Sequence, residues 1–134
     1  MSAFFDTNVL IYAQQPGRKG DRARALLAGG GRLSVQVLNE FAAVSSRKFA
    51  RDWTAIGEAI EDALTLLDPP LPLTLALHVA ARELAATHQV SFYDALVVAA
   101  ATEAGCDTLW SEDMQEGRVF GGLTIRNPFA GTTP

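Results

Sequence analysis

Short apolar runs alternate along the chain with longer segments in which apolar residues recur at helical spacing. The short runs predict buried strands, and the longer segments predict helices that pack one face inward. The predicted strands are Ala3–Phe5, Arg32–Val35, Thr108–Trp110 and Leu123–Arg126, with a further extended crossing at Leu71–Leu73. The predicted helices are Asn8–Gln14, Lys19–Ala28, Val37–Phe49, Trp53–Leu67, Leu77–His88 and Ser91–Ala104. Strands that alternate with helices predict an α/β fold with a mainly parallel sheet.

The composition is that of a folded protein with a large core. Of the 134 residues, 49% are apolar and 19% are charged, which excludes a disordered chain and predicts one domain over residues 1–134. The formal net charge of −4 excludes a generic polyanion-binding protein. Any contact with nucleic acid must therefore use local basic patches or a metal ion.

The cysteine content and the N-terminal sequence indicate the cellular compartment. Cys106 is the only cysteine, which excludes an intrachain disulfide and a cysteine-based zinc site, and we expect it to be a small buried residue. The N-terminal region lacks the basic start and the cleavage site of a signal peptide. No run approaches the roughly 20 apolar residues of a membrane span. We therefore expect a cytoplasmic protein without a membrane partner.

Two acids follow predicted strands. Asp6 comes directly after the first strand, and Asp113 comes shortly after the third. Ligands of open parallel sheets bind beyond the carboxyl ends of the strands, so both acids are candidates for a functional site. Each is also typical of a turn or a helix cap. Thr7 and Asn8 either orient Asp6 or a bound water, or they cap the next helix.

Two further acids lie on helices. Glu40 is on the apolar face of its predicted helix, where a half-buried carboxylate needs a metal or a nearby cation as a partner. Alternatively, it extends to the surface beside Arg47 or Lys48. Asp94 stands three residues after Ser91 at a predicted helix start, a pattern that is also typical of a capping box.

Taken together, the four acids favour a metal site more than any one does alone. Clustered carboxylates repel one another and raise each other's pKa unless a cation neutralises them. Ligand sets that contain only oxygen atoms select Mg²⁺ or Mn²⁺ over zinc. Such a site binds a phosphate oxygen and activates water for in-line displacement. The candidate metal ligands and catalytic residues are Asp6, Glu40, Asp94 and Asp113.

Four short motifs contain these acids. They are Phe5-Asp6-Thr7-Asn8-Val9-Leu10-Ile11-Tyr12, Asn39-Glu40-Phe41, Ser91-Phe92-Tyr93-Asp94-Ala95 and Ser111-Glu112-Asp113-Met114. In this order, and over nearly the whole chain, they resemble a PIN-domain ribonuclease, most closely the VapC toxins of bacterial type II toxin–antitoxin pairs. The family's acidic positions fall on the same four acids, and its hydroxyl two residues before the last acid falls on Ser111. That spacing favours Asp113 over the adjacent Glu112.

The resemblance implies a fold, an activity and partners. The fold is a three-layer α/β/α arrangement with a short, mainly parallel central sheet. The activity is Mg²⁺-dependent endonucleolytic cleavage of RNA, with Mn²⁺ as an alternative ion, by a homodimer that a co-encoded antitoxin protein restrains. We expect an antitoxin segment in an apolar groove near Glu40 and Trp53–Leu67, with a basic side chain entering the acidic pocket. The candidate contacts to the RNA backbone are the basic residues Arg18, Lys19, Arg22, Arg47 and Lys48. The alternative is that these side chains are only solvated surface charges.

Two other functions stay open. A catalytically silent PIN-like module would act only by binding its partner, and the presence of all four acids argues against it. A haloacid-dehalogenase-like phosphatase also begins with an aspartate after an apolar strand. Its chemistry needs a second aspartate two positions later, where this chain has Asn8. We therefore favour the RNA endonuclease.

Overall fold

The computed structural model describes residues 2–131, which form a four-stranded sheet covered by helices. The strands lie in the order β1-β2-β4-β3, where β1 is Ala3–Phe5, β2 is Thr108–Trp110, β3 is Val119–Phe120 and β4 is Leu123–Arg126. β1, β2 and β4 are parallel, and β3 pairs antiparallel with β4. Phe5 lies beside Trp110 in this register. The residues that follow them, Asp6 and Ser111, therefore leave the same end of the sheet.

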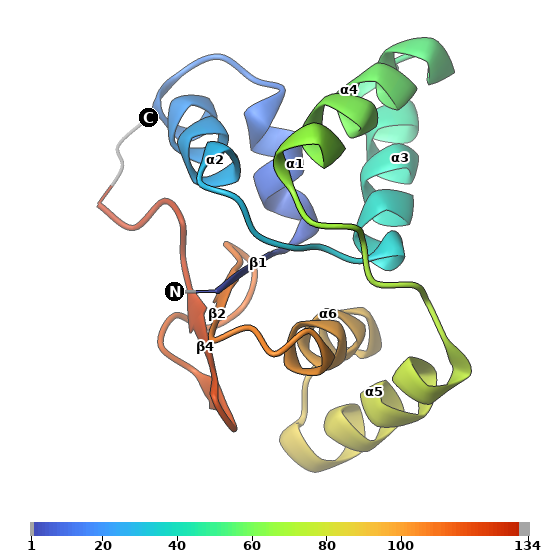
Figure 1. The fold of residues 1–134 in the computed structure, drawn as a ribbon, viewed down its shortest axis with the longest axis vertical. Helices are drawn as coiled ribbons and strands as arrows, with labels where there is room; N and C mark the ends of the chain where they lie inside the picture. Colours follow the sequence, from blue (N-terminus) through green and yellow to red (C-terminus); the bar gives the residue numbers. More distant parts are fainter. Residues whose placement is uncertain (1, 132–134) are drawn as a thin grey trace.

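Helices on both faces of the sheet explain why strands β1 and β2 are buried at nearly every position. The helices of residues 2–131 are α1 (Thr7–Ala13), α2 (Arg18–Ala28), α3 (Val35–Phe49), α4 (Trp53–Leu66), α5 (Leu75–His88) and α6 (Phe92–Glu103). Helices α1 to α4 gather on one side of the sheet, and α5 and α6 on the other (Figure 1). Phe4, Phe5 and Leu109 are fully buried between these layers. The predicted three-layer α/β/α fold with a mainly parallel sheet is confirmed.

Helix α6 is the buried helix that its sequence predicts. Residues 95–101 are all buried, and α6 packs against α5. Ser91 caps its N-terminus, because the Ser91 hydroxyl accepts a hydrogen bond from the backbone N–H of Asp94 at 3.3 Å. This cap holds Asp94 in the first turn of α6, where its side chain is half-buried.

The prediction of a strand at Arg32–Val35 is wrong. This segment makes two isolated parallel bridges, one to Phe4 and one to Leu71. It cannot continue as a strand because Ser34 caps α3. The Ser34 hydroxyl accepts a hydrogen bond from the backbone N–H of Val37 at 3.2 Å, and the helix begins at the residue after the cap.

Strand β3 was not predicted from the sequence. This strand has only two residues, which is too short for an alternating pattern to be recognised, and it joins β4 through a hairpin at Gly121 and Gly122. Gly121 has φ +60°, a left-handed conformation that glycine adopts without strain. The bounds of the six helices differ from the predicted ones by at most two residues.

Two other expectations concern Cys106 and the membrane. Cys106 is buried as predicted, and its thiol donates to the backbone carbonyl of Ala3 at 3.6 Å. Within residues 2–131, none of the helices combines the length and the apolar content needed to cross a bilayer.

Candidate active site

Asp6 is a buried acid at the carboxyl end of β1. Its exposed fraction is only 4%, and it caps α1. Oδ1 accepts a hydrogen bond from the backbone N–H of Thr7 at 2.7 Å, and Oδ2 accepts one from the hydroxyl of Ser111 at 2.7 Å. The capping role therefore uses one carboxylate oxygen, and the other oxygen faces the end of β2.

Ser111 holds that second oxygen in place. It is fully buried, and its backbone N–H donates to the carbonyl of Arg126 at 3.0 Å, which continues the β2–β4 ladder. Its hydroxyl also accepts a hydrogen bond from the backbone N–H of Met114 at 3.3 Å. Because every one of these contacts is to another element or to the next turn, Ser111 has one well-defined orientation toward Asp6.

Glu40 approaches from α3 and is half-buried, as its place on the apolar face predicts. Its Oε2 accepts a hydrogen bond from the hydroxyl of Thr7 at 2.8 Å, and its Oε1 accepts one from the side-chain amide of Gln36 at 3.3 Å. Thr7 thus contacts two acids: its backbone N–H binds Asp6 and its hydroxyl binds Glu40. In this way α1 links the carboxylates of β1 and α3.

Asn8 links Asp6 to the loop after β2. Its amide nitrogen donates to Asp113 Oδ2 at 3.2 Å and lies 3.5 Å from Asp6 Oδ2. Its amide oxygen accepts a hydrogen bond from the backbone N–H of Glu112 at 3.2 Å. The single amide group therefore orients Asp113 and fixes the backbone beside it.

Glu112, the acid adjacent to Asp113, has different partners. Its Oε2 forms an ion pair with the ammonium group of Lys19 at 2.8 Å, and its Oε1 accepts a hydrogen bond from the hydroxyl of Tyr12 at 2.9 Å. The hydrogen bond with Glu112 raises the pKa of Lys19, and burial raises the pKa of the Tyr12 hydroxyl. Both carboxylate oxygens of Glu112 are thus bound by groups outside the Asp6 cluster.

Asp94 and Glu40 act on Asp6 through their charges. Burial is the main reason why the pKa of Asp6 rises from its ordinary value of 3.8 to about 6, and the negative charges of Asp94 and Glu40 add to the rise. The hydrogen bonds from Ser111 and Thr7 favour the ionised form and lower this pKa. Elements as distant in sequence as α3 and α6 therefore place their acids within electrostatic reach of β1.

A groove with a volume of about 880 Å³ opens beside these acids. Its lining includes Glu40 and Asp113 together with Arg47, Lys48 and Tyr93. The Tyr93 side chain is 61% exposed, although it directly precedes Asp94. Phe49, which is also exposed, lines the groove as well, so the groove combines acids with two basic residues of α3 and two accessible aromatic rings.

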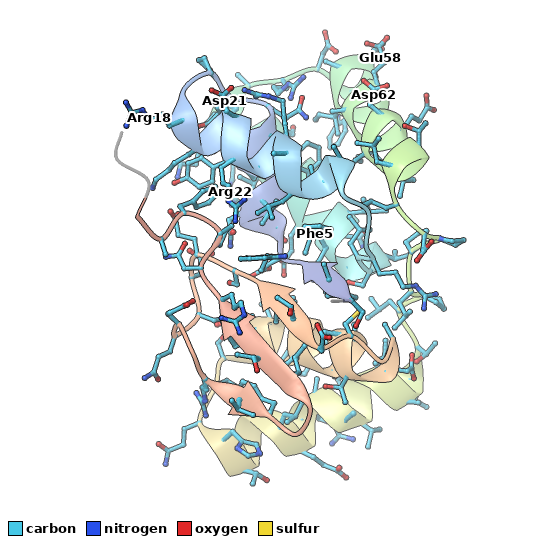
Figure 2. All side chains as sticks on the ribbon, turned by 60° about the vertical axis from the view of Figure 1, so that its left-hand side comes forward. Phe5, Arg18, Asp21, Arg22, Glu58 and Asp62 are labelled. Carbon is cyan, nitrogen blue, oxygen red and sulfur yellow. The ribbon has the colours of Figure 1, made fainter. Side chains whose placement is uncertain are left out.

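The basic residues of α2 lie elsewhere. Arg18 points outward from the start of α2, whereas Arg22 points toward the sheet (Figure 2). Arg22 Nε donates to the carbonyl of Pro128 at 3.1 Å, and its guanidinium lies 5.7 Å from the centroid of the Trp110 ring. Among the described residues, the basic cluster of α3 lines the groove and the cluster of α2 does not.

The donor atoms of the site fit a hard divalent cation, because they are oxygens of carboxylate, hydroxyl and amide groups. As the side chains of residues 2–131 are arranged, no three Asp, Glu, His or Cys residues converge closely enough to enclose an ion. The hydrogen bonds from Ser111 to Asp6 and from Thr7 to Glu40 each use one lone pair of a carboxylate oxygen, so these oxygens keep a further lone pair with which they could bind an ion.

Two groups that support the acids were not predicted from the sequence. Gln36 stands four residues before Glu40 on α3, and that helical spacing was an available signal. Tyr12 binds Glu112 across 100 residues of sequence, and a single sequence carries no signal for such a contact. The missed groups are thus neutral side chains that orient carboxylates.

Comparison with known proteins gives one family and several similar structures. A family model described as PIN domain matches residues 3–118. The crystal structure of Mycobacterium tuberculosis VapC20, described as a toxin that cleaves the sarcin-ricin loop, is 24% identical, has a TM-score of 0.68, and the match covers 84% of this chain and 92% of that one. A toxin–antitoxin complex from Klebsiella pneumoniae is 20% identical, with a TM-score of 0.69 and coverage of 95% and 98%. VapBC2 from Rickettsia felis, bound to a DNA fragment from its promoter, is 18% identical, with the same TM-score and coverage. No curated protein matches the chain.

Proposed function

Because the chain belongs to the PIN domain family, we propose that it is a metal-dependent endoribonuclease and the toxin of a toxin–antitoxin pair. The observation that carries this proposal is the buried carboxylate of Asp6. Its pKa is raised by burial and by the charges of Glu40 and Asp94, so the folded protein keeps a destabilising acid at the end of its sheet. Acids in such surroundings are typical of functional sites.

Asp6, Glu40, Asp94 and Asp113 are the proposed ligands of Mg²⁺, with Mn²⁺ as an alternative. When bound, such an ion stabilises negative charge on a phosphate and lowers the pKa of a coordinated water. The protein's own groups orient the carboxylates: Ser111 and Thr7 fix Asp6, and Asn8 orients Asp113. This division of roles matches metal sites in which neighbouring hydrogen bonds hold the ligands in place.

The groove beside the acids is the proposed binding site for the RNA strand. Arg47 and Lys48 supply positive charge for phosphate groups, and their position in the groove offsets the overall charge of −4 locally. The exposed ring of Tyr93 offers a surface on which a base can stack. Lys19 and Arg22 are engaged within the protein, which favours the α3 cluster as the backbone contact.

The proposed partners are an antitoxin and a second copy of the chain, in the cytoplasm. The similar structure from Klebsiella pneumoniae is a toxin–antitoxin complex, which supports an antitoxin partner. Phe49, Trp53 and Leu66 are exposed on α3 and α4, and they form the proposed surface for an antitoxin segment. Val119 is exposed and lines an apolar groove between α5, α6 and β3, which is the proposed dimer surface. A monomer in light scattering at micromolar concentration would contradict the dimer.

The two alternative functions fit the site less well. A phosphatase of the haloacid-dehalogenase type needs a carboxylic acid at position 8, where the Asn8 amide instead donates a hydrogen bond to Asp113. A silent module has no need of a buried acid with a raised pKa. We therefore retain the endoribonuclease as the proposed function.

The experiment that tests it is a cleavage assay with purified protein, a single-stranded RNA and either Mg²⁺ or EDTA, with p-nitrophenyl phosphate as the phosphatase substrate. We expect RNA cleavage with Mg²⁺ only, and no release of nitrophenol. We also expect products that end in 5′-phosphate and 3′-hydroxyl, the polarity that membership of the PIN domain family implies, and no 2′,3′-cyclic phosphate, because water is the attacking group. Products that end in 2′,3′-cyclic phosphate, or hydrolysis of the phosphatase substrate alone, would contradict the proposal.

A further inference from the structure

The two adjacent acids after β2 have different hydrogen-bond partners. Asp113 is exposed and contacts Asn8, whose amide also reaches Asp6. Glu112 also lines the groove, but it accepts one hydrogen bond from Lys19 and one from Tyr12, so both of its carboxylate oxygens are bound by groups outside the Asp6 cluster. The spacing from Ser111 favours Asp113 in the sequence, and these contacts distinguish the two acids in the structure.

Lys19 is itself held in a defined position. Its ammonium nitrogen lies 5.0 Å from the centroid of the Tyr12 ring and 5.4 Å from that of the Phe129 ring. The two rings pack edge to face with their centroids 4.6 Å apart. Cation–π contacts of this kind fix a lysine that would otherwise be mobile. Glu112 therefore meets an ordered cation that four separate segments of the chain build: α1, α2, the loop after β2 and the segment that contains Phe129.

The loop that carries Asp113 is thus fixed from two sides. On the inner side, the Ser111 hydroxyl binds Asp6 and the Glu112 backbone N–H binds Asn8. On the outer side, the Glu112 carboxylate binds Lys19 and Tyr12. Without the outer hydrogen bonds, a second negative carboxylate on this short loop would be free to turn toward the acid cluster.

We propose that Lys19 and Tyr12 are positioning residues that sequester the Glu112 carboxylate, so that Asp113 is the acid presented to the site. This inference rests on the proposed endoribonuclease function. It assigns Lys19 to the internal organisation of the site instead of to the RNA backbone. Because an ion pair at this level of exposure contributes little to global stability, removing it leaves the fold intact.

The test compares Lys19→Met, Lys19→Arg, Glu112→Gln and the double variant Lys19→Met/Glu112→Gln, with Arg82→Met on the exposed surface of α5 as control. We expect Lys19→Met to lower kcat for RNA cleavage roughly 10- to 100-fold, with little change in KM. Lys19→Arg keeps the ion pair and retains activity. The double variant recovers to the level of Glu112→Gln, because no free charge remains to be sequestered.

A second readout does not depend on RNA. Amide hydrogen exchange in residues 111–113 should be faster in Lys19→Met than in the wild type, and unchanged in Lys19→Arg and Arg82→Met. Unchanged exchange in Lys19→Met would overturn the inference, and so would a rise in KM alone, which indicates a direct RNA contact. A double variant no more active than Lys19→Met would also overturn it. If the wild type does not cleave RNA, the proposed function fails, and the exchange data alone decide whether Lys19 positions this loop.

Discussion

The hydroxyl of Ser111 donates a 2.7 Å hydrogen bond to the carboxylate of Asp6, although the two residues are 105 positions apart. Parallel pairing of β1 with β2 brings them together, because each directly follows its strand at the same end of the sheet. The bond orients an acid whose charged form is disfavoured by burial. The ionised Asp6 side chain therefore lowers the free energy of unfolding of the metal-free protein, and this destabilisation can be measured.

The stability of the protein without divalent ions should fall as pH rises through the titration of Asp6. The pKa of Asp6 is about 6 in the folded protein and near 3.8 when unfolded, so the folded state binds this proton more tightly. The protonated Asp6 side chain therefore contributes about 3 kcal/mol to the free energy of unfolding. This contribution is fully present below about pH 4 and is lost as the pH rises through about 6. In EDTA, Asp6→Asn should lack this loss and melt higher than the wild type at pH 7. Asp62→Asn, on the outer surface of α4 (Figure 2), should melt like the wild type. An Asp6→Asn protein that melts lower at pH 7 would identify Asp6 as a cap alone.

Added Mg²⁺ should reverse or narrow that order of melting temperatures. An ion that binds only the folded wild type stabilises it by about 2.7 kcal/mol at a hundredfold excess over Kd. Asp6→Asn removes a charged ligand and should gain less. Thermal melts at increasing Mg²⁺ check this, and equal gains in both proteins would argue against Asp6 as a ligand.

Two glycine substitutions should have opposite effects on the fold. Gly31 has φ +143°, and a Cβ there would lie 2.7 Å from the backbone carbonyl oxygen of Ala3, so Gly31→Ala should destabilise the packing beside β1. Gly57 lies within α4 with open space around it, so Gly57→Ala should stabilise by about 0.5–1 kcal/mol. Denaturant unfolding midpoints measure both. An unchanged unfolding midpoint for Gly31→Ala would show that the backbone at Gly31 and Ala3 adjusts more freely than the structure indicates.

Removing the basic residues of the groove should weaken RNA binding uniformly across sequences. Arg47→Ala/Lys48→Ala should flatten the dependence of log affinity on log salt concentration by roughly 0.7 for each phosphate that the variant no longer neutralises. Binding is measured with a labelled single-stranded RNA in the Asp6→Asn background, which prevents cleavage. Arg82→Ala on α5 serves as control. An unchanged salt dependence would show that the RNA backbone does not contact Arg47 and Lys48 of α3.

The sequence predicted the elements that are marked by apolar runs or helical spacing, and it failed where a local hydrogen bond decides the structure. Helix α6 and strands β1 and β2 follow from apolar composition alone. The Ser34 cap ended the predicted strand at Arg32–Val35, because one side-chain hydrogen bond to Val37 starts a helix there. The spacing of apolar residues does not indicate whether this segment continues as a strand or starts a helix.

For the site, the sequence indicated which acids are candidates but not their partners. Glu40 was predicted to be half-buried, and it is. Its hydrogen bonds come from the neutral groups of Thr7 and Gln36, which no charge pattern indicates. Lys19 was predicted as a candidate RNA contact because it lies in a basic cluster. Its ion pair with Glu112 spans 93 residues and depends on how α2 packs against the loop after β2. Ion pairs of that kind arise from the tertiary fold, and a single sequence does not encode them locally.

Asp6 is proposed to serve catalysis at the expense of stability, and the rate at which Asp6→Asn cleaves RNA in Mg²⁺ tests this role most directly. The substitution keeps the shape of the side chain and the acceptor for the Thr7 backbone N–H. We predict that Asp6→Asn, while fully folded, cleaves at least roughly 100-fold more slowly than the wild type, and that Asp62→Asn cleaves at the wild-type rate. A folded Asp6→Asn protein that cleaves RNA as fast as the wild type would contradict the proposed catalytic role of Asp6.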